Sequence, residues 1–175
     1  MLAAGLSPPA VAEPPPPVRW SVVVEAVAAQ PETPGAPGES APSLIVPLAP
    51  EQPRFGVLFR HSVEHTPVIE WFEPSSDGGG LVLVATEYRS LGAGLPTEPP
   101  PGARFVLLPD RFLIEGLAVP VGELIVRPLP LTEHALLAGG ARYDLTHLAG
   151  SGHVLRIRVQ RSPGPGDHIQ EEGRR

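Results

Sequence analysis

The chain has 175 residues and a formal net charge of −6, a length typical of one domain. All 13 basic residues are Arg, so the absence of Lys excludes a lysine Schiff base, a P-loop lysine and a Ser–Lys dyad. The absence of Cys excludes disulfides and thiolate catalysis, and the acidic balance argues against a nucleic-acid partner, whose phosphates need a basic surface. No apolar run reaches the ~20 residues of a membrane-spanning helix.

Proline and glycine divide the chain into a folded part and its flanks. An Ala/Pro-rich leader at 1–17 contains Ala10-Val11-Ala12, an A-x-A pattern of the kind that signal peptidase cleaves, without the basic and apolar regions that should precede it. It is either the remnant of a longer export signal or a leader without function. We expect one domain at 18–161, with a flexible Pro/Gly insertion at 28–42 and a disordered tail at 162–175.

From residue 18 onward the apolar residues follow a period of two, which predicts strands rather than helices. Turn-forming segments separate these runs, among them PSSDGGG at 74–80 and a hairpin turn at Gly139-Gly140. Only one short helical turn is expected, near Leu145–Leu148. The predicted strands cover residues 18–27, 43–49, 54–62, 67–73, 81–90, 104–108, 111–116, 121–127, 133–138, 141–145 and 153–161. The fold class is therefore all-β, an antiparallel β-sandwich or partly open barrel of roughly ten short strands.

The segment HSVEH at 61–65 matches H-x-x-E-H, the zinc motif of the inverzincin peptidases. That motif needs a helix, because only there do residues four apart bring two imidazoles to one ion. Residues 54–62 alternate as a strand does, and Thr66-Pro67 disfavours a helix directly afterwards. We therefore expect no metal site and no cofactor.

Other polar residues could still form a functional cluster, which we assign to His61, Ser62, Glu64, Glu70 and Glu87. If the chain reverses near Glu64–Thr66, Glu70 lies diagonally across from His61, ~7–8 Å away. A hydrogen-bonded structural role is the simpler expectation. Acid–base catalysis or binding of a hard cation is the alternative.

A glycine-containing loop, SLGAGLP at 90–96, is the second candidate site, because its glycines permit φ > 0 and close backbone approach. Its candidate binding residues are Ser90, Gly92, Ala93, Gly94, Leu95 and Pro96. A tight connector is the simpler expectation, and a solute-binding loop beside a concave pocket is the alternative.

Three segments together resemble a known family: FRHSVEHTPVIEWFE (59–73), GLVLVATEYRSLGAGLP (80–96) and AGGARYDLTHLAGSGHVLRIRVQR (138–161). They are similar to domain of unknown function family 1850, small β-rich bacterial proteins with HS-x-E-x-x-P-V, S-x-GAG-LP and a closing Arg-rich strand. The signature falls on His61, Ser62, Glu64, Pro67, Val68, Gly92, Ala93, Gly94, Leu95 and Pro96, whereas His65 occupies an unspecified position.

The resemblance implies an accessory role and no known reaction. Members are often encoded beside TRAP transporters of the TAXI class, so the implied partner is the membrane subunit or the solute-binding protein of such a transporter. The expected location is extracytoplasmic or membrane-associated, and cytoplasmic if translation starts at Met1. We expect a non-enzymatic accessory protein; the alternative is a small hydrolase or cation-dependent enzyme that uses the His/Glu cluster.

Overall fold

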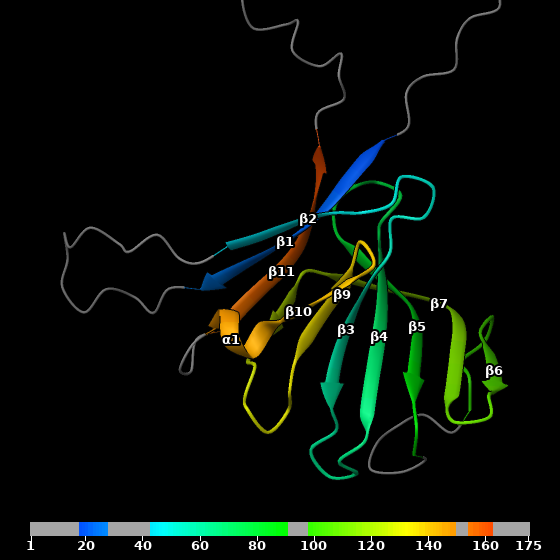
Figure 1. Cartoon of the computed structure of the whole chain (residues 1–175). Helices are drawn as coiled ribbons and strands as arrows, with labels where there is room; N and C mark the ends of the chain where they lie inside the picture. The colour runs from blue at the N-terminus through cyan, green and yellow to red at the C-terminus, as the bar shows by residue number, and fades with distance from the viewer. Residues whose placement is uncertain (1–17, 28–42, 91–97, 150–153, 163–175) are drawn as a thin grey trace, which may run out of the picture.

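The computed structural model describes residues 18–27, 43–90, 98–149 and 154–162. Within these residues the chain forms two antiparallel sheets that do not close into a barrel (Figure 1). The first has the order β2-β1-β11-β8 and the second the order β10-β9-β3-β4-β5-β7-β6. The leader, the insertion and the tail predicted at 1–17, 28–42 and 162–175 lie outside the described residues, except for Ser162.

The strands and the helix begin and end close to the predicted positions. Their bounds are β1 Arg19–Val27, β2 Ser43–Pro47, β3 Phe55–Arg60, β4 Pro67–Pro74, β5 Leu81–Tyr88, β6 Arg104–Leu107, β7 Phe112–Gly122, β8 Leu124–Val126, β9 Ala135–Ala138, β10 Ala141–Asp144, α1 Leu145–Ala149 and β11 Val154–Ser162. The predicted all-β fold is confirmed as an open sandwich. Among the described residues no helix is long and apolar enough to cross a bilayer.

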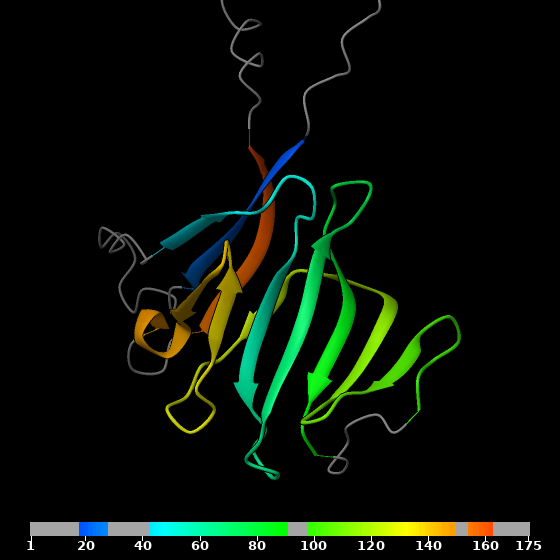
Figure 2. The same cartoon turned by 45° about the vertical axis from the view of Figure 1, so that its right-hand side comes forward.

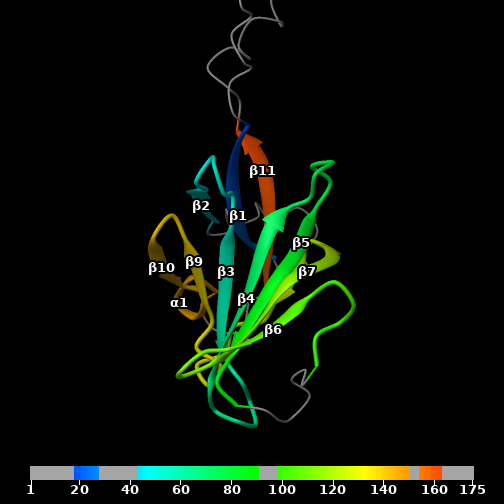
Figure 3. The ribbon, with the colours of Figure 1, turned by 90° about the vertical axis from the view of Figure 1, so that its right-hand side faces the viewer.

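The core lies where the inner faces of the two sheets meet. Val22, Val24 and Ile157 of the four-stranded sheet pack in one buried cluster with Phe55 and Phe72 of the seven-stranded sheet. The strands of this cluster contribute alternate residues, as the period of two predicts, and a second cluster of Val68, Tyr88 and Ile114 lies under the β6–β7 side of the larger sheet. Figures 2 and 3 show the four-stranded sheet behind one part of the seven-stranded sheet, with β6 at the side remote from it.

One predicted strand boundary is wrong. Of the two strands expected at 111–116 and 121–127, the first continues to Gly122 as β7 and the second is the shorter β8, Leu124–Val126. Gly116, at φ +74°, lies at an irregularity in the β5–β7 ladder, where the partner residues shift from Glu115 opposite Ala85 to Val119 opposite Leu83. A β-bulge of this kind bends a strand without ending it. The chain changes sheet only after Gly122, at φ +76°.

Turn chemistry accounts for the connections. Gly139 and Gly140 have φ of +58° and +77°, so both occupy the region that a type I′ hairpin turn requires. In the β4–β5 turn the Asp77 carboxylate accepts a hydrogen bond from the Gly79 amide at 2.9 Å and another from the Ser75 hydroxyl. These hydrogen bonds lower the pKa of Asp77.

Candidate functional site

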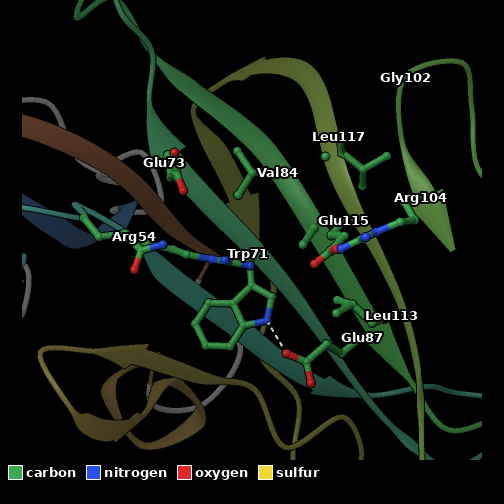
Figure 4. Close-up of a pocket in the computed structure, with 13 residues that line it drawn as sticks. Arg54, Trp71, Glu73, Val84, Glu87, Gly102, Arg104, Leu113, Glu115 and Leu117 are labelled. Atoms are coloured by element: carbon green, nitrogen blue, oxygen red, sulfur yellow. Dashed lines mark hydrogen bonds and ion pairs between the residues drawn. The ribbon is translucent and has the colours of Figure 1, made fainter. Parts of the chain in front are cut away.

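The outer face of the seven-stranded sheet, which points away from the core, carries a hollow of about 930 Å³ (Figure 4). Its centre is a row of paired residues that crosses four strands: Trp71 of β4, Ala85 of β5, Glu115 of β7 and Arg104 of β6. Paired residues in antiparallel strands share a face, so these four side chains all lie on the outer side. Because Ala85 has a small side chain and lies between Trp71 and Glu115, it forms the floor of the hollow.

Trp71 is held on three sides. Below it lies its cross-strand partner Gly56, where a Cβ atom would stand 3.0 Å from Cζ3 of the indole. The indole Nε1 donates a hydrogen bond of 2.7 Å to Oε1 of Glu87, and the guanidinium carbon of Arg54 lies 4.7 Å from the ring centroid. The Trp71 side chain therefore has a defined position on the sheet surface, set by its contacts with Gly56, Glu87 and Arg54.

The charges around the hollow are partly compensated. Oε2 of Glu87 forms an ion pair of 2.9 Å with Nε of Arg111, and Arg104 forms an ion pair with Glu115. The side chain of Glu73, which also lines the hollow, has no ion pair or hydrogen bond within the described chain. Nε of Arg54 is buried and has no hydrogen-bond acceptor among the described residues, and the Trp71 ring lies beside its guanidinium. The hollow thus contains charged side chains that form ion pairs and the carboxylate of Glu73, which forms none within the described chain.

The HSVEH segment forms the turn between β3 and β4 rather than a helix. Nδ1 of His61 accepts hydrogen bonds from the amides of Val63 (3.3 Å) and Glu64 (3.2 Å). The His65 amide donates to the carbonyl oxygen of His61 at 2.9 Å, and His65 has φ of +53°. The His61 ring therefore caps the backbone of its own turn. Within the described residues no three His, Asp or Glu side chains gather as a metal-ligand group.

Two members of the sequence motifs do meet. The hydroxyl of Ser90, the first residue of the SLGAGLP segment, donates a hydrogen bond of 2.9 Å to Oε2 of Glu64. Ser62 lies exposed in the same β3–β4 turn. The end of β5 is thereby tied to this turn. The remaining members of the candidate binding loop, Gly92, Ala93, Gly94, Leu95 and Pro96, lie outside the described residues.

The expected cluster of His61, Glu70 and Glu87 is not one site. The chain does reverse between β3 and β4, but His61 lies opposite Thr66, its amide donating to the Thr66 carbonyl at 2.9 Å. Glu70 lies opposite Val57, four residues further along β4 than Thr66, or about 13 Å. Glu70 also faces the core, whereas Glu87 shares the outer face with Trp71. Strand alternation therefore separates the two carboxylates.

Burial raises the pKa of the partly buried Glu70 carboxyl, which lies on the core face between Val57 and Thr86. On the same face His134 stacks on Phe59, with ring centroids 5.7 Å apart, and burial lowers the pKa of its imidazole. Nδ1 of His134 is 2.8 Å from the Thr132 hydroxyl. These two titratable groups belong to the interior and not to the hollow.

Sequence reasoning selected Glu87 but missed the other charged and aromatic residues of the hollow. They are Arg54, Trp71, Glu73, Arg104 and Glu115, together with Arg111, which lies outside the hollow and pairs with Glu87. The period of two carried a usable signal, because it places Trp71 and Glu73 together on the polar face of β4. Tryptophan is enriched where one end of a side chain is apolar and the other is wet, so a tryptophan on the polar face of a strand marks that face as a candidate binding surface.

Comparison with protein families gives one match: the family described as Domain of unknown function (DUF1850) matches residues 55–145. That range begins with β3 and extends through β10 to the first residue of α1. Comparison with curated proteins and with solved structures gives no match.

Proposed function

The chain belongs to the DUF1850 family, and from this premise we propose that it is a non-enzymatic accessory domain of a TAXI-type TRAP solute transporter. It would act at the outer face of the cytoplasmic membrane by binding the membrane subunit or the solute-binding protein. The choice of partner rests on the family resemblance. The choice of surface rests on the structure.

The observation that supports a binding role is the open outer face of the seven-stranded sheet. Its inner face is buried, with Phe55, Val68 and Phe72 at most 1% exposed. On the outer side Trp71 and Glu87 remain partly exposed around a hollow whose volume is within the range of ligand-binding clefts. Binding a partner there would remove the aromatic surface from water without disturbing the core.

The enzyme alternative, a small hydrolase or cation-dependent enzyme, requires His61 and the carboxylates within one hydrogen-bond shell. Glu70 and Glu87 lie on opposite faces of the sheet, and Nδ1 of His61 is engaged by its own turn. The hollow offers better-supported chemistry, namely recognition by an indole, guanidinium groups and carboxylates. We therefore favour binding over catalysis.

The direct test is co-purification of the tagged full-length chain with the membrane subunit and with the solute-binding protein of a TAXI-type transporter from the same genome. We expect one of them to be retained by the wild type and lost with Trp71→Ala. Ile125→Ala serves as the matched control, because Ile125 is 56% exposed on the other sheet. No retention of either component, with or without the transported solute, would refute the proposal.

A further inference from the structure

We propose that the partner docks by adding an extended segment to the free edge of β6 as an eighth strand of the seven-stranded sheet. This inference rests on the proposed function and specifies how the partner is bound. β6 contributes Arg104 to the wall of the hollow, so edge and hollow form one continuous surface. In β-strand addition, backbone hydrogen bonds supply affinity and side chains beside the edge supply specificity.

Among the edge strands of the described structure, β6 is the one that borders the hollow. At the opposite edge of the same sheet the β9–β10 turn lies against β2, with the Cβ position of Gly139 3.4 Å from the Pro47 carbonyl oxygen. In the four-stranded sheet neither of the edge strands β2 and β8 lines the hollow. β6 is the strand furthest from the four-stranded sheet (Figures 1 and 3).

The hydrogen-bond phase of the β6–β7 hairpin identifies which backbone groups point outward. The Leu108 amide donates to the Arg111 carbonyl at 2.9 Å, so this pair is hydrogen-bonded. Hydrogen-bonded and non-hydrogen-bonded pairs alternate along an antiparallel ladder. The pairs Leu107–Phe112 and Phe105–Ile114 are therefore non-hydrogen-bonded, and the N–H and C=O groups of Phe105 and Leu107 face away from β7.

These outward groups have no protein partner within the described chain. Proteins commonly protect such an edge with Pro, Lys, a bulge or a covering segment. β6 reads RFVL, and only Arg104 among its residues is charged. Leu107 is 71% exposed. Apart from its length of four residues and the charge of Arg104, this edge has none of these protections and can serve as a template for another strand.

The side chains beside the edge indicate the chemistry of the added segment. Arg104 lies on the outer face with 76% of its side chain exposed, and Nε and Nη2 are the atoms that it directs to Glu115. Its remaining donors suit a carboxylate at the cross-strand position of the added strand. Phe105 and Leu107 lie on the opposite face and suit apolar or β-branched partners. The segment is therefore an extended one that alternates apolar residues with an acidic residue.

The test uses a matched pair of variants at one position. Leu107→Pro removes the outward N–H but leaves the β6–β7 hydrogen bonds intact, because that N–H does not face β7. Leu107→Ala removes the same side chain and retains the N–H. The probe is a capped seven-residue peptide of alternating Val and Thr with a central Asp, and its counterpart has a central Lys.

Binding is followed by amide NMR of the full chain, with hydrogen exchange at Phe105 and Leu107 as the specific readout. We expect the Asp peptide to slow exchange at Phe105 and Leu107 and the Lys peptide to bind roughly two- to fivefold more weakly. Leu107→Pro should weaken binding about tenfold or more relative to Leu107→Ala, since it removes a hydrogen bond and adds a bulky ring at the edge.

Three results would overturn the inference: equal binding by the two variants, no protection of Phe105 and Leu107 at saturating peptide, or protection that grows with protein concentration without peptide. The last would identify a second copy of the chain as the occupant. Co-purification separates this inference from the proposed function. A transporter component retained equally by wild type and Leu107→Pro refutes the edge alone, whereas none retained by wild type refutes the proposed function.

Discussion

Gly56→Ala tests whether Trp71 is fixed in place on the outer face. A Cβ atom at position 56 would lie 3.0 Å from Cζ3 and 3.1 Å from Cε3 of Trp71, and 3.1 Å from Cγ2 of Ile69. Carbon atoms in favourable contact are about 3.5–4.0 Å apart, so all three contacts are short by roughly half an ångström. The indole has little freedom to retreat, because Nε1 is hydrogen-bonded to Glu87 at 2.7 Å.

Overpacking of this kind costs about 1–3 kcal/mol. Replacing Gly by Ala in a strand returns about 0.5–1 kcal/mol, because the unfolded chain loses less freedom on folding. We expect Gly56→Ala to lower the free energy of unfolding by roughly 0–2.5 kcal/mol, the difference of these two terms. Trp71→Val removes the two contacts with the ring and leaves the contact with Ile69, so in that background the same substitution should cost less.

Urea denaturation of the wild type, both single variants and the double variant completes this cycle. The four transitions should have similar slopes, since a change in slope would mean that the compared states differ in exposed surface. A cost of Gly56→Ala that is unchanged in the Trp71→Val background would refute the argument, because the clash would then not involve the indole. A stabilising effect in the wild-type background would refute it as well.

Three further predictions concern the core and one turn. Burial raises the Glu70 pKa above 4.5, so ionisation of this carboxyl destabilises the folded state once the pH exceeds about 4.5. In urea titrations the Glu70→Gln variant should therefore be more stable than wild type at pH 7, and this difference should disappear by pH 3. Burial lowers the His134 pKa below 6.5, so protonation of the imidazole destabilises the folded state as the pH falls through 6.5. Between pH 7 and pH 5 the His134→Gln variant should lose less stability than wild type. An equal loss would show that His134 is not the source of the pH dependence. Gly140 has φ +77° and open space around its Cβ position. In thermal unfolding, Gly140→Ala should lower the stability of the protein by about 1–2 kcal/mol, and Gly140→Asn should lower it distinctly less.

The strands were predictable because alternation and turn chemistry are local properties. The run FGVLFR places Phe55, Val57 and Phe59 on one side, and the structure buries the first two on the core face. Gly139-Gly140 predicted the position and type of the β9–β10 turn for the same reason. In both cases a few neighbouring residues contain all the information that the structure uses.

Registers were less predictable, because they depend on where a turn is centred. A reversal centred on His65 would place His61 opposite Ile69, whereas the observed turn places it opposite Thr66. This difference of three residues amounts to about 10 Å along the strand and, being odd, changes which face a partner residue shares. The bulges at Val84 and Gly116 escaped prediction for a related reason, since the extra residue appears only when two strands are paired.

The family match covers only part of the fold. Residues 55–145 contain every strand of the seven-stranded sheet, whereas β1, β2 and β11 of the four-stranded sheet lie outside. The part common to the family therefore carries Trp71, the hollow and the β6 edge. The core still needs the other sheet, because Val22, Val24 and Ile157 cover the inner face. The four-stranded sheet thus stabilises the fold by covering the inner face, and the seven-stranded sheet exposes the outer face and edge that we propose as the partner-binding surface.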